Sequence, residues 1–362
     1  MCPGVGRDAT TGYASLRLLA VELARSGYTT LRFDYLGTGN SGDLDGQDPG
    51  ATWLANIGAA ADALRATGVR RIVFCGVRLG ALLAATKAVD EADACAVVLV
   101  DAVMSGSGYL RELRIASQLG SGGPALDDSP LELDDLHLTD SAAAALRSLS
   151  LRSMEMKPGL PLLLLNSAAS AASRKFAERM RALGSEVSES GFEPMNDHDE
   201  NGEVTRVSPI GAVKSWLVAV ARPSFRVTPP AWPRAAASLS TGSFSEQALR
   251  FGPAGRLFGM LCRPRQSARP NLVVLIGSAG AASHHGHFRF HVMLARRLAE
   301  AGIASLRLDF AGLGESDPGA HEESTHVYAT GREGDIASAN RCTSGARLPP
   351  VRGRRLVLRS VP

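Results

Sequence analysis

The feature that constrains this chain most is an internal repeat. Residues 23–41 read LARSGYTTLRFDYLGTGNS and residues 298–316 read LAEAGIASLRLDFAGLGES, with nine identical positions. Each copy has the pattern of a helix end, a glycine turn, an apolar strand, and an Asp followed by a glycine-rich loop. A spacing of 275 residues (from Leu23 to Leu298) is too long for a solenoid, so the repeat predicts two copies of one domain.

Apolar strands alternate with helices along the first copy. Strands are expected at residues 28–33, 71–76, 94–100 and 161–165, and helices at 52–67, 79–89, 173–183 and 210–220. Continuous apolar strands separated by helices indicate a parallel sheet covered on both faces. The pattern therefore predicts an α/β fold with a doubly wound, mostly parallel sheet. The polar, helix-prone residues 105–157 interrupt the alternation and are expected to form a helical cap.

The second copy is partial. A proline-rich linker at residues 223–245 follows the first domain (residues 1–222) and precedes the second copy (residues 246–335). There, strands are expected at residues 248–251, 257–262, 271–276 and 304–309, with a helix at 291–300. The first copy lacks these opening strands, and the second lacks the later strands and helices of the first. One hypothesis is therefore that residues 246–310 add their strands to the sheet of the first copy, because unpaired strands are costly.

The net charge of +3 comes from the last 22 residues, which hold six arginines and no lysine or acidic residue. The remainder is slightly acidic and gives no argument for a nucleic-acid partner. Residues 336–362 have three interpretations: an arm for nucleic acid or phospholipid, a disordered terminus, or translation in a shifted reading frame. The abrupt end of the repeated pattern near Asp335 favours the third, and we expect this tail to be disordered.

The cysteines and the hydropathy of the sequence indicate the cellular compartment in which the protein is expected. The five cysteines are scattered without a CxxC pair, so we expect no disulfide framework. We expect no signal peptide and no stable membrane insertion, because no apolar run approaches the roughly 20 residues of a membrane helix. A cytoplasmic location is the expectation.

Two runs resemble the α/β-hydrolase superfamily, in particular its serine aminopeptidase-like branch: residues 31–41 (LRFDYLGTGNS) and residues 74–80 (FCGVRLG). The second copy, with residues 277–280 and His284-His285-Gly286, is similar to exosortase-associated hydrolases. The resemblance implies an α/β-hydrolase fold and hydrolysis of an ester or amide acyl bond in a small molecule. It implies no metal and no organic cofactor.

A nucleophile elbow is expected where this superfamily places G-x-S-x-G between a strand and a helix. Here the frame is Gly76-x-x-x-Gly80, and the central residue is Arg78. A guanidinium stays protonated and has no lone pair for attack, so the covalent mechanism fails at its first step. Either Arg78 aims its charge at an anionic ligand, or the frame persists for folding and Arg78 points to solvent.

The resemblance also places the other site residues. Asp101 is a candidate acid, with a capping carboxylate as the alternative. His198 is the candidate base, with a solvated loop histidine as the alternative. Gly4 and Leu79 are candidates for the oxyanion hole, a pair of backbone N–H donors. We expect Asp34 to shape its loop.

The histidines of the second copy raise the question of a metal. His287 and His291 have the i, i+4 spacing of a helical metal pair, but the Glu of H-E-x-x-H is missing. We therefore expect no metal. The second copy has no recognisable elbow.

These patterns predict an α/β-hydrolase-family protein whose ancestral acyl-hydrolase activity is impaired at Arg78. The alternatives are a non-catalytic module that binds an anionic small molecule, and a gene remnant. Whether the chain is an enzyme, and its oligomeric state, stay open at this stage.

Overall fold

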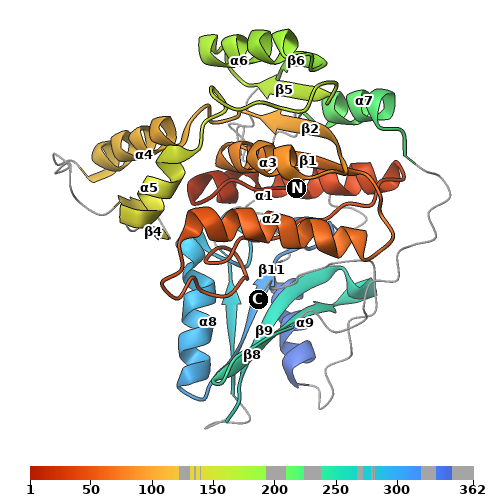
Figure 1. Cartoon of the computed structure of the whole chain (residues 1–362). Coiled ribbons are helices and arrows are strands. Elements are labelled where there is room, and N and C mark those ends of the chain that lie inside the picture. The colour runs from red at the N-terminus through yellow and green to blue at the C-terminus, as the bar shows by residue number, and fades with distance from the viewer. Residues whose placement is uncertain are drawn as a thin grey trace.

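The computed structural model describes residues 1–121, 131–133, 136–138, 140–192, 209–223, 238–266, 272–278, 280, 282–318 and 332–344. Two sheets organise these residues, one in an N-terminal unit (residues 1–223) and one in a C-terminal unit (residues 238–344) (Figure 1). No helix in the described part of the chain combines the length and apolarity needed to cross a membrane.

The N-terminal sheet is parallel throughout and has the order β1-β2-β5-β6. Its strands are β1 (Ile72–Val77), β2 (Ala94–Val100), β5 (Leu162–Asn166) and β6 (Val187–Gly191). The helices are α1 (Arg7–Arg25), α2 (Pro49–Arg65), α3 (Leu79–Asp90), α6 (Ala171–Ala182) and α7 (Ile210–Val220). The expected doubly wound α/β architecture is confirmed.

Helices cover both faces of this sheet because successive strand residues point to opposite sides. Phe74, Val97 and Leu99 belong to a core that includes residues of α2, α3 and α6. Their neighbours Val98 and Val100 pack instead with α1 and α7. Both faces are apolar, which explains why the strands read as continuous apolar runs.

The expected cap region contains α4 (Gly106–Ser121), α5 (Asp140–Ser148) and a short antiparallel pair, β3 (Leu131–Leu133) and β4 (Leu136–Leu138). Helices α4 and α5 contact each other closely, and a Cβ on Gly106 would lie 1.8 Å from the Leu146 carbonyl oxygen. Helix α4 also contacts α3. The expected cap region therefore contacts α3, the helix that follows the Gly76-x-x-x-Gly80 frame.

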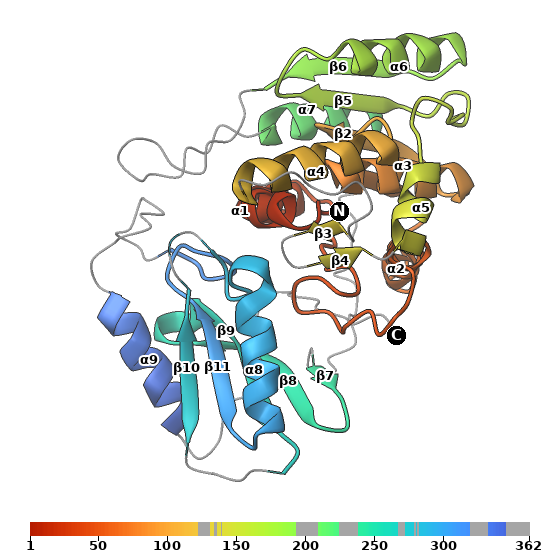
Figure 2. The ribbon, with the colours of Figure 1, turned by 90° about the vertical axis from the view of Figure 1, so that its left-hand side faces the viewer.

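The C-terminal sheet has the order β10-β11-β9-β8-β7. Its strands are β7 (Ser238–Ser240), β8 (Phe244–Phe251), β9 (Leu257–Pro264), β10 (Val273–Gly277) and β11 (Ala304–Asp309), with 3₁₀ turns at Pro253–Gly255 and His287–Arg289. Helix α8 (Phe290–Glu300) packs on one face and α9 (Arg332–Ser344) on the other (Figure 2).

Four expectations need correction. Residues 28–33 form no strand, because a strand needs a ladder of backbone hydrogen bonds to a partner. The N-terminal segment beside them supplies one such bond, from the Met1 amino group to the Leu31 carbonyl. The two copies do not share a sheet in the described residues. Strands β7 and β8 begin inside the expected linker, at Ser238 and Phe244. Helix α9 crosses the expected start of the tail and buries Ala339, so disorder is wrong for residues 336–344.

All five cysteines are free, as expected.

Two glycines test the packing of the N-terminal unit. Gly12 lies inside α1 with nothing within 4 Å of an added Cβ, so Gly12→Ala is expected to stabilise the fold by about 0.5–1 kcal/mol. A Cβ on Gly80 would lie 2.1 Å from the Pro3 carbonyl oxygen, so Gly80→Ala is expected to destabilise it by roughly 1–3 kcal/mol. Urea unfolding of both variants measures the difference, and equal effects would contradict this packing.

Candidate functional site

The elbow has the backbone geometry that the sequence frame predicts. Arg78 connects β1 to α3 with φ 54° and ψ −121°, a conformation that costs energy for a residue with a side chain. A Cβ on Gly76 would lie 2.3 Å from the Gly80 carbonyl oxygen. Glycine at both positions therefore allows the strand and the helix to approach, and the turn keeps its strain although a nucleophilic residue is missing.

Two carboxylates hold Arg78 at the tip of this turn. Its Nε lies 3.3 Å from Oδ2 of Asp8 in α1, and its Nη2 is bonded to Glu112 in α4. The Tyr109 hydroxyl donates to the same Asp8 oxygen over 3.4 Å. Burial alone would lower the pKa of Arg78, but Asp8 and Glu112 raise it. Arg78 thus lies at the start of α3 and pairs with carboxylates of α1 and α4, a role that neither interpretation made from sequence included.

Asp101 ends β2 in a left-handed conformation with φ 45°. Its Oδ1 accepts a hydrogen bond of 2.7 Å from the Ser167 amide, and its own amide donates to the Leu165 carbonyl. These bonds tie the carboxyl ends of β2 and β5 together. His198 lies outside the described residues.

The two oxyanion candidates lie close to the elbow. Leu79 is the first residue of α3, so its amide has no carbonyl one turn earlier in the helix. Gly4 follows a segment bonded to β1, where the Cys2 amide donates to the Cys75 carbonyl. A Cβ on Gly4 would lie 2.6 Å from Cβ of Asp8, the residue that holds Arg78. The ion pair between Arg78 and Asp8 therefore lies beside both candidates.

The strain at Arg78 gives a matched pair of variants. Arg78→Ala and Arg78→Gly both lose the ion pairs, which contribute about 0–1 kcal/mol at partly exposed positions. Only glycine relieves the positive φ, so Arg78→Gly is expected to be about 1–2 kcal/mol more stable than Arg78→Ala. Thermal and urea unfolding of the two proteins measure this gap. Equal stability would mean that the turn is unstrained.

The repeated loops have the same internal structure in both units. Asp34 Oδ2 accepts from the Asn40 amide over 2.9 Å, and Asp309 Oδ2 accepts from the Glu315 amide over 2.8 Å. Gly39 and Gly314 both have φ 49°, and a Cβ on either would lie 2.2 Å from the Asp carboxyl group. Asp34 and Asp309 therefore shape their loops, as expected for Asp34.

The two loops meet at the contact between the units. Asn40 shares a 2.9 Å hydrogen bond with Nε2 of His284, and its Oδ1 accepts from Arg307 over 3.0 Å. His284 Nδ1 lies 2.8 Å from Oδ2 of Asp309. All four side chains are buried. Since His284 bonds to an amide on one side and a carboxylate on the other, the Asp of the second loop is linked to the first loop.

Arginines of the C-terminal unit complete this contact. Arg289 donates to the Gly39 carbonyl over 2.9 Å and pairs with Asp43. Arg296 donates to the Ser41 carbonyl over 3.1 Å and pairs with Glu246 over 2.8 Å. Buried polar groups are tolerated only when they are hydrogen-bonded. The loop carbonyls and the two carboxylates supply these bonds.

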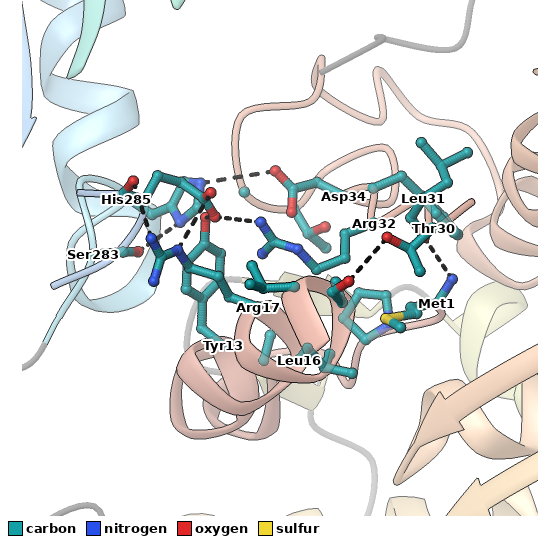
Figure 3. Close-up of a pocket in the computed structure, with 18 of the residues that line it drawn as sticks. Met1, Tyr13, Leu16, Arg17, Thr30, Leu31, Arg32, Asp34, Ser283 and His285 are labelled. Carbon is teal, nitrogen blue, oxygen red and sulfur yellow. Dashed lines mark hydrogen bonds and ion pairs between the residues drawn. The ribbon is translucent and has the colours of Figure 1, made fainter. Parts of the chain in front are cut away.

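A cavity of about 540 Å³ lies between the units (Figure 3). One end, which we call the apolar end, is lined by α1 and the segment after it, with Leu16, Ala20, Val21 and Leu31 beside the polar Thr29 and Thr30. The other end is polar and carries groups from both units, including Tyr13, Arg32, Asp34, Ser283, His285 and Glu315. A volume of this size fits a small organic ligand, which is ordinarily held in a pocket of about 300–1,000 Å³.

Glu315 is the electrostatic centre of the polar end. Its carboxylate accepts 2.6 Å hydrogen bonds from Arg32 and from the Tyr13 hydroxyl, and Arg17 lies 3.8 Å away. Burial alone would raise the pKa of Glu315, but Arg32, Arg17 and Tyr13 outweigh it and lower the pKa to about 2. Burial raises the pKa of Tyr13 well above its usual value. Glu315 is ionised and Tyr13 is a neutral donor at neutral pH.

Glu315 is expected to make stability depend on pH. Its folded pKa of about 2 lies below the unfolded value of 4.5, so its contribution is present above pH 4.5 and is lost as the pH falls toward 2. The shift corresponds to about 3 kcal/mol. Glu315→Gln is expected to lose that stability at pH 7 and little at pH 2. Urea unfolding across this range checks it, and a pH-independent cost would contradict the assignment.

Sequence reasoning did not assign a role to Ser283 or Tyr13, because each belongs to a site only through residues of the other unit. A signal was present for His285, since the second copy holds most of the histidines. Among the residues that the structure describes, no His, Cys, Asp and Glu side chains gather in a group that could hold a metal.

No protein-family model matches this chain, and no curated protein does. Among solved structures, a monoacylglycerol lipase from Paleococcus ferrophilus is similar at 18% identity, covering 56% of this chain and 88% of the lipase with a TM-score of 0.38.

Two further structures are similar. A proline iminopeptidase-related protein from Thermus thermophilus matches at 18% identity, 59% of this chain, 86% of that protein and TM-score 0.37. An esterase from Pyrococcus furiosus matches at 17% identity, 52% of this chain, 72% of that esterase and TM-score 0.36. Scores of this size do not by themselves establish a function.

Proposed function

We propose that this protein is an α/β-hydrolase relative whose elbow performs no nucleophilic catalysis, and that it binds a small neutral molecule with an apolar part in the cavity between its units. The observation that carries the proposal is Arg78, which occupies the tip of an intact elbow and is held by Asp8 and Glu112. A protonated guanidinium cannot attack an acyl carbon.

The charges at the cavity favour a neutral ligand over the anionic one considered from sequence. Arg32 and Arg17 both pair with Glu315, and Arg17 also pairs with Asp317 over 2.8 Å. Arg289 pairs with Asp43. An anion that bound Arg32 or Arg17 would have to displace Glu315, whose carboxylate is buried against both guanidinium groups. An uncharged ester or amide can instead accept a hydrogen bond at the polar end and bury its apolar part beside Leu16 and Leu31.

The serine aminopeptidase-like branch and the truncated tandem origin are part of this proposal. They rest on the elbow frame at residues 76–80 and on the two Asp loops, whose hydrogen bonds repeat between the units. In the proposed ancestor, the elbow residue carried out acyl transfer on a small molecule without a cofactor. The gene-remnant alternative would lack a cooperative core.

N-octylacetamide, a neutral probe with an apolar chain, tests the proposal by thermal unfolding. It is expected to raise the Tm of the wild type, because it binds only the folded state. Ala20→Phe, which places a ring at the apolar end of the cavity, is expected to abolish the shift. Gly12→Ala changes the same helix where an added Cβ meets no neighbour, and should keep it.

Arg78→Ala should also keep the Tm shift, because Arg78 holds α1 and α4 and does not line the cavity. Loss of the Tm shift in Arg78→Ala would indicate that the ligand binds at the elbow, which would contradict the proposal. A broad, non-cooperative transition of the wild type would favour the gene remnant.

A further inference from the structure

Ser283 and His285 form a hydrogen-bonded pair at the polar end of the cavity (Figure 3). Ser283 Oγ lies 2.8 Å from Nδ1 of His285. The turn between them is closed by the Gly286 amide, which donates to the Ser283 carbonyl, and Ser278 Oγ donates to the same oxygen over 2.8 Å. The hydroxyl and the ring are thus fixed by their own loop before a ligand arrives.

The other ring nitrogen of His285 faces the N-terminal unit. Nε2 lies 3.8 Å from Oδ2 of Asp34 and is a buried atom without a hydrogen-bond partner among the described residues. The ring also meets Tyr13 edge-on, with the ring centroids 5.4 Å apart. A hydroxyl, an imidazole and a carboxylate therefore follow one another across the contact between the units. Ser283 and His285 come from the C-terminal unit and Asp34 from the N-terminal unit.

This order allows one arrangement of protons that suits a base. If Nε2 carries the ring proton toward Asp34, Nδ1 has a free lone pair for the Ser283 hydroxyl proton. Burial lowers the pKa of His285 well below its usual value, and the nearby guanidinium groups of Arg307, Arg289 and Arg32 act in the same direction. His285 is therefore neutral at pH 7 and can accept a proton.

We propose that Ser283 is a nucleophile for acyl transfer, that His285 is its general base, and that Asp34 is a positioning residue that acts through His285. This inference rests on the proposed function only in using the same cavity for the substrate. Ser283 takes the role of the nucleophile that the elbow lacks, and the three residues come together only when the two units are in contact.

The reaction is written for a neutral ester. The bond from Ser283 Oγ to the acyl carbon forms as the hydroxyl proton moves to Nδ1 of His285. The bond from the acyl carbon to the ester oxygen then breaks, and the leaving alcohol takes the proton from Nδ1. Water then attacks the acyl carbon and gives a proton to Nδ1. The bond from the acyl carbon to Ser283 Oγ breaks, Oγ takes that proton, and a carboxylic acid is released.

The cavity selects the substrate class. Leu16, Ala20, Val21 and Leu31 form an apolar end opposite the serine, so it suits an ester with an apolar chain. Arg17 and Arg32 are already paired with Glu315, so these side chains do not favour a charged substrate. We expect alkyl esters to react and short charged esters to react poorly.

An alkyl fluorophosphonate tests the nucleophile directly in the full chain. The bond from Ser283 Oγ to phosphorus forms, the phosphorus–fluorine bond breaks, and the proton leaves with fluoride. Intact mass should rise by one adduct, and peptide mapping should place it on Ser283. Ser283→Ala should abolish the adduct, and His285→Gln should slow it at least about 100-fold, since a general base contributes roughly 10²–10⁴-fold. The exposed Ser107→Ala serves as the matched control and should react like the wild type.

The pH profile tests the role of Asp34. Labelling needs neutral His285, so the rate is expected to rise with pH through a midpoint below about 6.5. Asp34→Asn removes a negative charge that favours the protonated ring, so it should move the midpoint to lower pH. A residue that only shapes its loop would change the rate without moving the midpoint.

An adduct on another serine, or none on a folded protein, overturns the inference. The N-octylacetamide shift separates this failure from that of the proposed function. If Ser283→Ala and the wild type both show the Tm shift while neither is labelled, the cavity binds but Ser283 is not a nucleophile. If the shift is absent and Ser283 is labelled, the nucleophile stands and the binding proposal fails.

Discussion

The hydrogen bonds between residues 39–41 and the C-terminal unit are the contact on which the rest of the structure depends. Arg289 and Arg296 donate to carbonyls of this loop, and Arg307 donates to the Asn40 side chain. A buried arginine without partners would cost several kcal/mol, roughly as an uncompensated charge does in a protein interior. The loop therefore has one well-bonded position. Because the cavity is lined from both units, its shape follows from this contact.

The elbow shows how a backbone geometry persists without the chemistry that accompanies it in the superfamily that the sequence resembles. The sharp turn at Arg78 needs glycines on either side, and both are present and tightly packed. The side chain then determines what the turn does, and here it joins α1 to α4 through Asp8 and Glu112. The strained backbone at Arg78 therefore belongs to a turn that links α1 to α4, and the cavity that could hold a ligand lies elsewhere, between the two units.

Most of the fold was predictable because it follows from local pattern. The apolar run of β11 was predicted with its observed bounds, as was α7, and β2 likewise. Residues 28–33, the equivalent run of the first copy, form no strand, because a strand needs a partner strand and the local pattern does not supply one. Strand β6 was missed because its residues are mostly exposed and lack the apolar pattern of the others.

By itself, the sequence determined the parallel α/β sheet, the repeated Asp loops, the elbow frame and the inability of Arg78 to act as a nucleophile. These follow from side-chain periodicity, from the steric freedom of glycine, and from the chemistry of one guanidinium. Only the tertiary structure decided that the two copies keep separate sheets, which carboxylates hold Arg78, and that Asp34 faces His285. The physical reason is distance along the chain: such pairs are 34 to 251 residues apart (Arg78 to Glu112, and Asp34 to His285), and no local pattern encodes which of many charged groups will meet.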